Sequence, residues 1–202
     1  MISVTTQVIW SMVAVLLTAC ICAFGLLCCR VRGIPIALSA RSVALVALPS
    51  VIFSGVGIHA TYVWAALTLS ALSAYALIDA HTGYVFDLSL YPFALIVIGH
   101  AWFASGGDVL GGMAVAAAMF GLPFLATNGG GMGFGDVKLS LGIGSILGPS
   151  LAFSAFTLAF IAGALFAMIR RNSAPLDGAI PFVPFILVGT LLAGGYVVYA
   201  FR

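Results

Sequence analysis

Residues 129–144 read GGGMGFGDVKLSLGIG, and this stretch passes from a run of glycines into an apolar segment that carries one acid and one base. Asp136 and Lys138 are the only charged residues between Asp108 and Arg170. Glycines before a helix permit a tight turn, because glycine adopts positive φ angles and lets other groups approach closely. The stretch therefore predicts an apolar helix that begins with an acid.

The composition around this stretch indicates a lipid environment. At 63% hydrophobic and 6% charged residues, the chain is far more apolar than soluble domains, in which about 25% of residues are charged. Backbone polar groups cannot face lipid unpaired, so apolar runs of about 20 residues predict helices rather than barrel strands. We therefore expect an all-α polytopic membrane protein, a single transmembrane domain over 1–202 in a lipid bilayer, with no nucleic-acid partner.

Eight membrane spans are predicted along the chain. They cover residues 8–29, 42–58, 61–78, 88–105, 108–127, 137–148, 150–169 and 180–201. The sixth is the weakest, because helical residues rise about 1.5 Å each and this segment falls well short of a hydrocarbon core of about 30 Å. It is either a short complete crossing that ends at Gly148-Pro149-Ser150 or a half-span that turns back.

The basic residues favour a complete crossing, since Lys and Arg near span ends collect on the cytoplasmic side of a membrane. If all eight segments cross, Arg202 alone lies opposite a face that holds Arg30, Arg32, Arg41, Lys138, Arg170 and Arg171. The N-terminus is then outside. Asp108 also lies outside, and the cytoplasmic ends of spans hold Asp79, Asp87, Asp136 and Asp177.

Asp79 and Asp136 are predicted to be catalytic partners. Asp79 ends the third span in 76-ALIDAHTGYVFDLSLYP-92, and Asp136 opens the sixth, so both lie at a similar depth on one face. Two carboxyl groups within a few ångströms share one proton, so one can act as base toward a water while the other donates to a carbonyl oxygen. Gly133 and Gly135 suit such a site, because a substrate backbone can approach glycine closely.

Three separated motifs resemble those of the type IV prepilin peptidases, a family of membrane aspartic peptidases with a GxGD motif. The stretch 133-GFGDVKL-139 is similar to the segment around that family's second catalytic aspartate. Asp79 and Asp87 keep the family's spacing of Asp, seven residues, then Asp or Asn. The stretch 180-IPFVPFIL-187 resembles the start of the family's last span.

The resemblance covers residues 61–190 and implies a function. A prepilin or pseudopilin, with a basic leader before an apolar helix, would be cut at the cytoplasmic boundary of the inner membrane. Asp79 and Asp136 would activate a water, with no metal or organic cofactor. The loop 30–41 has no Cys and is too short for the zinc-binding insertion of larger members, which indicates the compact form found in tight-adherence (Flp) pilus systems and leaves N-methyltransferase activity open.

Other residues have structural as well as functional interpretations. Asp87 fits a helix N-cap as well as a role in the site. Lys138 fits an interfacial anchor or a residue that binds substrate; at about 200° from Asp136 around a helix, it should not share a face with that acid. The G-x-x-x-G pairs fit close packing within the chain or a homo-oligomer face, and they begin at Gly107 and Gly144.

Two rival functions remain open at this stage. Intramembrane proteases of the presenilin and signal-peptide-peptidase kind also use GxGD, but they pair it with Tyr-Asp and Pro-Ala-Leu, whereas Asp79 here follows Ile78 and Pro-Ala-Leu is absent. An ion or proton transporter would place its acids near the middle of the membrane, often in repeated halves. Neither feature is visible in the sequence.

The predicted topology can be tested by cysteine labelling in a background without the native cysteines. Single cysteines at Arg32 and Arg171 should be protected from an impermeant thiol reagent added outside, and one at His59 should react. These outcomes follow from the positive-inside rule applied to eight crossings. Labelling of position 171 from outside would instead mean that segment 137–148 turns back.

Overall fold

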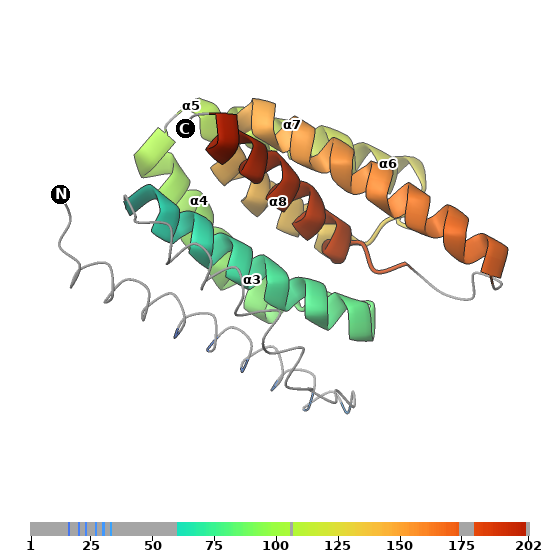
Figure 1. Ribbon diagram of the computed structural model, residues 1–202. Coiled ribbons are helices and arrows are strands. Elements are labelled where there is room, and N and C mark those ends of the chain that lie inside the picture. Colours follow the sequence, from blue (N-terminus) through green and yellow to red (C-terminus); the bar gives the residue numbers. More distant parts are fainter. Residues whose placement is uncertain are drawn as a thin grey trace. The chain divides into compact units, whose positions relative to one another are not determined.

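The computed structural model describes residues 60–105, 107–173 and 180–200, together with Leu16, Cys20, Ala23, Leu27, Arg30 and Gly33 (Figure 1). The chain divides into two compact units, Met1–Thr82 and Gly83–Arg202. Every element among the described residues is a helix. The predicted spans 8–29 (apart from the single residues named above) and 42–58 lie outside the described residues, as do Arg32, Arg41, His59 and Asp177.

The first unit contributes helix α3 (Ala60–Thr82), where the sequence predicts a span over 61–78. Three of its hydroxyl groups, those of Thr68, Ser73 and Thr82, donate to carbonyl oxygens one turn earlier in the same helix. Thr68 donates to Trp64 O at 2.8 Å, and Ser73 donates to Leu69 O at 2.7 Å. Such local bonds let hydroxyl groups occur in an apolar helix without unpaired polar atoms.

The second unit contains the other helices of the described residues. They are α4 (Asp87–Ser105), α5 (Gly107–Ala116), the π-helical turn η1 (Ala117–Gly121), α6 (Leu122–Ala126), α7 (Phe134–Ser173) and α8 (Val183–Ala200). The elements α5, η1 and α6 follow one another without a break and occupy the predicted span 108–127. Helix α7 takes in both 137–148 and 150–169, while α4 and α8 agree with predicted spans to within three residues at either end.

Two stretches among the described residues are long and apolar enough to cross a membrane, Asp108–Ala126 and Phe134–Arg170. Two shorter apolar helices are Asp87–Phe103 and Val183–Gly194. These helices agree with the all-α prediction and with a membrane setting. The predicted number of eight spans and the outside N-terminus stay predictions.

Helix α7 breaks at Gly148, which has φ 68° and ψ 174°. Positive φ is costly for residues with a Cβ, so glycine suits this position. Pro149 follows and has no N–H to continue the helical hydrogen bonds of the preceding arm. The Gly-Pro pair therefore separates α7 into a first arm, 134–147, and a second arm, 150–173.

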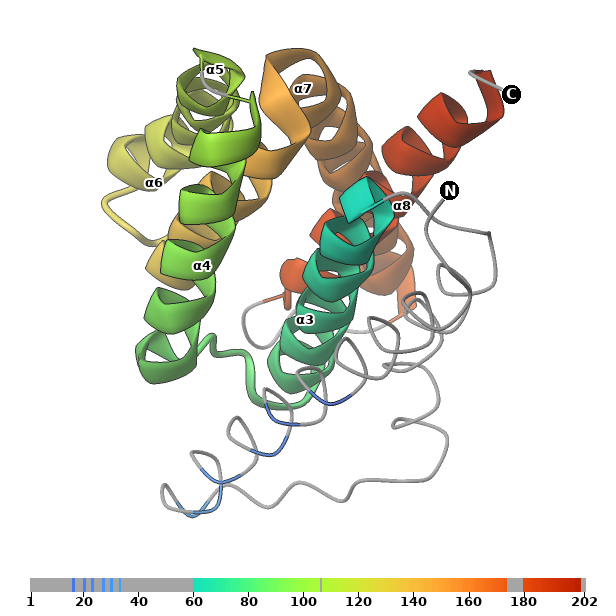
Figure 2. The same ribbon diagram turned by 90° about the vertical axis from the view of Figure 1, so that its left-hand side faces the viewer.

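The two arms run in opposite directions, as their contacts with one neighbouring helical run show. The first arm meets α6 where the Phe134 and Phe124 rings are 5.2 Å apart, and at its far end Gly144 faces α5. The second arm starts beside Gly111 of α5 and reaches Phe120 of η1 with its Phe156 ring. The chain thus reverses at Gly148, as the ribbons of Figures 1 and 2 show.

Glycines allow the first arm to pack against α5 with backbone in contact with backbone. A Cβ built on Gly112 would overlap the carbonyl group of Gly144. A Cβ on Gly144 would in turn overlap Gly112 O and lie 3.1 Å from the Ala116 Cβ. The small residues predicted to mediate close packing do so within this chain at Gly144, so a homo-oligomer face is not needed to explain that glycine.

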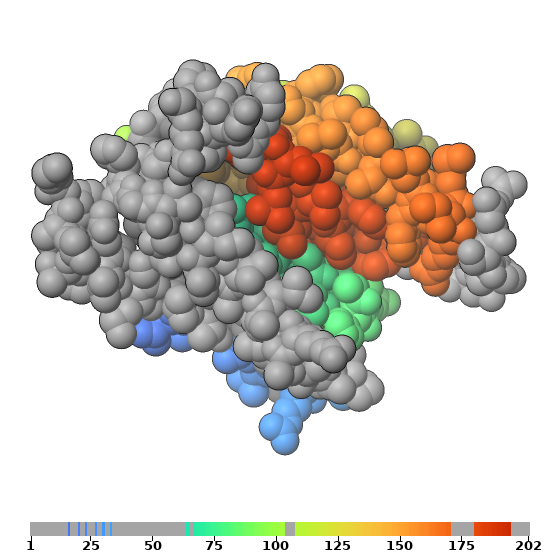
Figure 3. Space-filling model, in the orientation of Figure 1, coloured from blue at the N-terminus to red at the C-terminus, as the bar shows by residue number. Residues whose placement is uncertain are grey.

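Aromatic rings join the second arm to η1 and α8. The Phe120 ring is fully buried and lies 5.0 Å from Phe156 and 5.8 Å from Phe182, centroid to centroid. Gly163 makes room for Phe182, since a Cβ there would come within 2.9 Å of that ring. Figure 3 shows the surface of α8 lying directly against that of the second arm. The phenylalanines of the stretch 180–187 therefore have a packing role.

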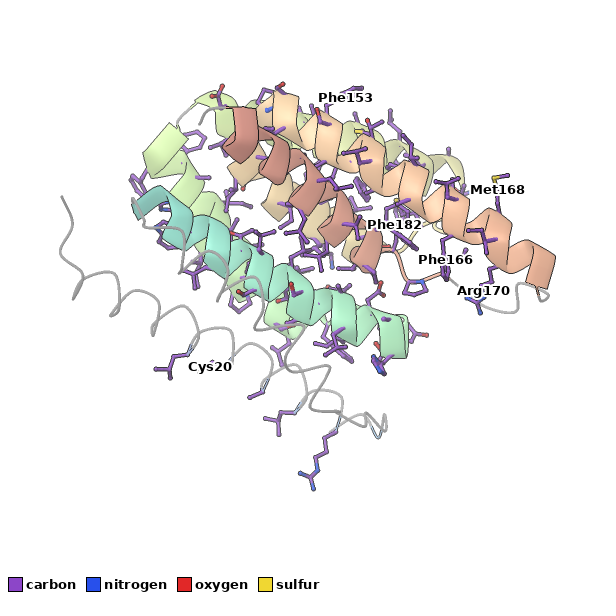
Figure 4. All side chains as sticks on the ribbon, in the orientation of Figure 1. Cys20, Phe153, Phe166, Met168, Arg170 and Phe182 are labelled. Carbon is purple, nitrogen blue, oxygen red and sulfur yellow. The ribbon has the colours of Figure 1, made fainter. Side chains whose placement is uncertain are left out.

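The outer side of the second arm exposes large apolar side chains. Figure 4 shows Phe153 near the start of this arm and Met168 and Arg170 near its end. Phe153 is 58% exposed and Met168 is 66% exposed. Burying such side chains against lipid is favourable, whereas exposing a row of them to water would not be. This surface fits a helix whose outer side meets the bilayer.

The contact between Gly112 and Gly144 predicts a stability difference between two Gly→Ala variants. Gly112→Ala should destabilise the protein by about 1–3 kcal/mol, because the added methyl overpacks a backbone contact. Gly99→Ala in α4 is the matched control, since a Cβ there meets nothing within 4 Å; it should be neutral or slightly stabilising. Thermal unfolding of both purified proteins in one detergent gives the comparison, and equal midpoints would contradict the predicted packing.

Candidate active site

Asp136 lies in the first turn of α7, as the sequence predicts. The turn begins at Gly133, whose carbonyl oxygen accepts hydrogen bonds from the N–H groups of Asp136 at 3.1 Å and Val137 at 3.4 Å. A carboxylate in this position is stabilised by the positive end of the helix dipole. Asp136 as a whole residue is partly exposed.

The two glycines of the GxGD stretch serve different purposes. A Cβ on Gly133 would lie 3.2 Å from Oδ2 of Asp136, so glycine leaves the carboxylate uncrowded. A Cβ on Gly135 would come within 2.9 Å of the Val85 Cβ. Gly135 therefore lets the segment between α3 and α4 approach α7 closely. Of the two, only Gly133 leaves space beside the Asp136 carboxyl group, and the prediction that both glycines face a substrate stays a prediction.

The residues before Gly133 form an exposed turn that leads from α6 to α7. Asn128 and Gly129 have φ angles of 49° and 77°, and the Gly129 N–H donates to Phe124 O at 2.9 Å. The Thr127 hydroxyl accepts a hydrogen bond from the Gly131 N–H at 3.0 Å. These bonds close the end of α6 and set the direction in which the chain enters α7.

Lys138 points toward α4 and forms an ion pair there. Its Nζ is 2.8 Å from Oδ1 of Asp87. The same Nζ lies 4.5 Å from the ring centroid of Phe134 and 5.0 Å from that of Tyr91. The separation of Lys138 from the face of Asp136 stays a prediction, and none of these three partners was predicted from the sequence.

A local signal for two of those partners exists in the sequence. Phe134 precedes Lys138 by four residues, and Tyr91 follows Asp87 by four residues. Residues four apart lie on the same side of a helix. Each ring could thus have been assigned to the charge on its own helix, although the pairing of the two helices could not.

Asp87 is the first residue of α4, with the carbonyl oxygen of Phe86 accepting the first hydrogen bonds. The N–H groups of Ser89 and Leu90 donate to Phe86 O at 3.2 and 3.1 Å, and the Ser89 hydroxyl donates to it at 2.9 Å. The capping position therefore belongs to Phe86, one residue before the predicted Asp87. The Asp87 side chain, which is 55% exposed, pairs with Lys138.

Asp79 lies in the last turns of α3 and is only 4% exposed. A carboxyl group is costly to bury, and acids retained in apolar helices commonly belong to functional sites. Beyond it, the exposed His81 ring is joined through Nδ1 to Leu77 O at 2.9 Å. Asp79 belongs to the first unit and Asp136 to the second, so their pairing stays a prediction.

Within the second unit, the described charged residues other than Asp108 lie toward one end. The ion pair of Lys138 with Asp87 joins the starts of α7 and α4. Asp108 lies at the opposite end, where a Cβ on Gly148 would be 3.7 Å from the Asp108 Cβ. The reversal at Gly148 brings the second arm back from that end, so Arg170 returns toward the end with Lys138. Among the described residues, no group of three or more His, Cys, Asp or Glu could hold a metal ion.

Comparison with known proteins identifies the family. The model of the type IV leader peptidase family matches residues 66–168, just over half of the 202 residues. The match includes Asp79, Asp87 and the GxGD stretch, and it stops before residues 180–187. No curated protein and no solved structure matches the chain. The length of the match and its position over both aspartates are sufficient for assignment, and the chain belongs to the type IV leader peptidase family.

Proposed function

We propose that the protein is an aspartic endopeptidase that removes the basic leader from type IV prepilins or pseudopilins. Family membership makes it a peptidase of the leader-peptidase kind, with a prepilin-type substrate and a membrane setting. The proposal adds that Asp79 and Asp136 are the catalytic residues. The observation that carries it is the family match, which extends over both acids.

The geometry around Asp136 supports a catalytic role. The carboxyl group belongs to a partly exposed residue on the first turn of a helix and has a glycine where any side chain would crowd Oδ2. A helix cap alone would not require that space beside the carboxylate. Val85, which contacts Gly135, follows Asp79 by only six residues in the sequence. The chain that leaves Asp79 therefore reaches the GxGD turn after a short connection.

The proposed chemistry needs one proton shared between the two carboxyl groups. The ionised carboxylate takes a proton from a water molecule, and the water oxygen attacks the carbonyl carbon of the scissile peptide bond. The protonated carboxyl group donates its proton to the carbonyl oxygen. When the resulting tetrahedral intermediate collapses, the C–N bond breaks and the amine takes the proton that the first carboxyl group removed from water. One hydroxyl group of the intermediate returns a proton to the second carboxylate, so the pair again shares one proton. The products are a leader with a new carboxylate and a mature protein with a new amino group.

The position of the basic residues supports a cytoplasmic active site in the inner membrane. Lys138 and Arg170 lie toward the same end of the second unit as Asp136, and positive residues collect on the cytoplasmic side. A prepilin helix could lie in the bilayer while its basic leader stays in the cytoplasm. The bond between leader and helix would then lie at the level of Asp136. Gly133, Lys138, Gly135 and Asp87 support this site or bind the substrate.

Asp79→Asn and Asp136→Asn should each reduce leader removal by about 1000-fold or more, because neither variant can share a proton as the pair does. Asp108→Asn is the matched control, since Asp108 also lies in the first turn of an apolar helix but at the opposite end of the unit. It should keep wild-type activity. The measurement is the mobility shift of a co-expressed prepilin, with each variant's amount in the membrane determined in parallel. Full activity of Asp136→Asn would reduce this acid to a structural role.

The rate of cleavage should depend on pH as a bell. Activity should fall on the alkaline side when the shared proton is lost and on the acid side when the second carboxyl group becomes protonated. The measurement is the initial rate with a detergent-solubilised prepilin at fixed ionic strength, with protein integrity checked at each pH. A rate that kept rising into strongly alkaline solution would argue against two carboxyl groups that share a proton.

A further inference from the structure

The ion pair of Lys138 with Asp87 connects the second turn of α7 with the start of α4, two helices whose first residues are distant in the sequence. Lys138 Nζ and Asp87 Oδ1 are 2.8 Å apart, across 51 residues of chain. The lysine side chain is 18% exposed, whereas that of Asp87 is 55% exposed. An ion pair on an exposed surface contributes little, but this lysine is largely enclosed. The enclosure comes from the two helices that the pair joins.

Two aromatic rings complete that enclosure. Phe134 comes from the first turn of α7 and Tyr91 from the second turn of α4, with centroids 4.5 and 5.0 Å from Lys138 Nζ. An ammonium group within about 6 Å of a ring face is attracted by the ring's electrons. Lys138 is thus held by groups from both helices at once. We call these four residues, Lys138, Asp87, Phe134 and Tyr91, the clamp.

The first turn of α7 needs such support because its own sequence stabilises it poorly. Gly133 begins the turn and has no side chain with which to cap the exposed N–H groups. Gly135 lies within the turn, and glycine has the greatest backbone freedom to lose there. The hydrogen bond from the Val137 N–H to Gly133 O is long, at 3.4 Å. A turn of this kind opens easily unless contacts outside it hold it closed.

The clamp also determines the direction in which Asp136 points. Successive residues of a helix are separated by about 100°, so Lys138 and Asp136 project about 200° apart. With Lys138 held against α4, the turn cannot rotate about its axis without breaking the ion pair. We propose that Lys138 and Asp87 are positioning residues that fix the first turn of α7, and with it the carboxyl group of Asp136, for peptide cleavage. This inference rests on the proposed function.

The kinetic test removes each charge with little change in shape. Lys138→Met and Asp87→Asn should each lower kcat for prepilin cleavage by about 10- to 100-fold, the effect of a catalytic group displaced by about 1 Å. KM should stay within about twofold of wild type, because the clamp does not bind the leader. The double variant should be no slower than the worse single variant, since both substitutions break the same contact. Arg170→Met removes a positive charge from the same helix and should behave as wild type.

Four other kinetic results would each contradict the proposed positioning role in a different way. A rise in KM with unchanged kcat would overturn positioning and make Asp87 or Lys138 a binding residue for the charged part of the substrate. Losses that multiply in the double variant would show that the two residues act separately. Wild-type activity in both single variants would show that Lys138 and Asp87 have no role in cleavage. The proposed catalytic role of Asp136 would be unaffected by that result. Failure of wild-type protein to cleave any prepilin would overturn the proposed function together with positioning for that reaction.

A second measurement tests, in the absence of substrate, whether the clamp stabilises the first turn of α7. Hydrogen exchange of the backbone amides over 135–138 should be faster in Lys138→Met and Asp87→Asn than in wild type, by about tenfold or more, because the turn opens more often. Amides in α8 should exchange at the wild-type rate in both variants, which controls for global unfolding. Unchanged exchange over 135–138 would overturn the clamp even if catalysis were affected.

Discussion

The reversal of α7 at Gly148 is the constraint on which the second unit depends. Gly148 has a positive φ angle, and Pro149 cannot donate the next helical hydrogen bond, so one long apolar helix becomes two arms that run in opposite directions. The first arm can then pack along α5, and the second arm can carry α8. Without the reversal, these two sets of contacts could not lie on one compact unit. The reversal at Gly148 also brings Arg170, near the end of the second arm, back toward the end of the unit that holds Lys138.

Glycine meets three different structural requirements in this unit, and it can meet each of them because it has no side chain. At Gly148 the requirement is a backbone conformation, and at Gly112 and Gly144 it is the approach of two helix backbones. At Gly133 it is empty space beside the Asp136 carboxyl group. A helix of ordinary composition would provide none of these. The cost is a weakly stabilised first turn at the GxGD stretch, where neighbouring helices must contribute the rigidity that glycine does not.

In the proposed site, the carboxyl group that would carry out the chemistry is separate from the residues that would support it. Asp136 provides a carboxyl group at a helix start, while Lys138 projects away from it and contacts α4. A peptidase in a membrane must receive a substrate helix from the bilayer and still hold its acids in a fixed geometry. Contacts between helices on the side away from the acid allow this. In the proposed mechanism they would hold the turn without occupying the space that the peptide bond enters.

The described helices and the candidate acids could be predicted from residues that are close together in the sequence. Apolar length placed the span predicted over 88–105 close to α4 (Asp87–Ser105), and the glycine run placed Asp136 in a first turn, because both depend on residues close together in the chain. The ion pair of Lys138 with Asp87 and the contact of Gly144 with Gly112 could not be predicted in this way. Those contacts join residues 51 and 32 positions apart. Helix periodicity shows which side of a helix a residue occupies, but the partner on that side depends on how the helices pack, which is set by the reversal at Gly148 and by glycines on the facing surfaces.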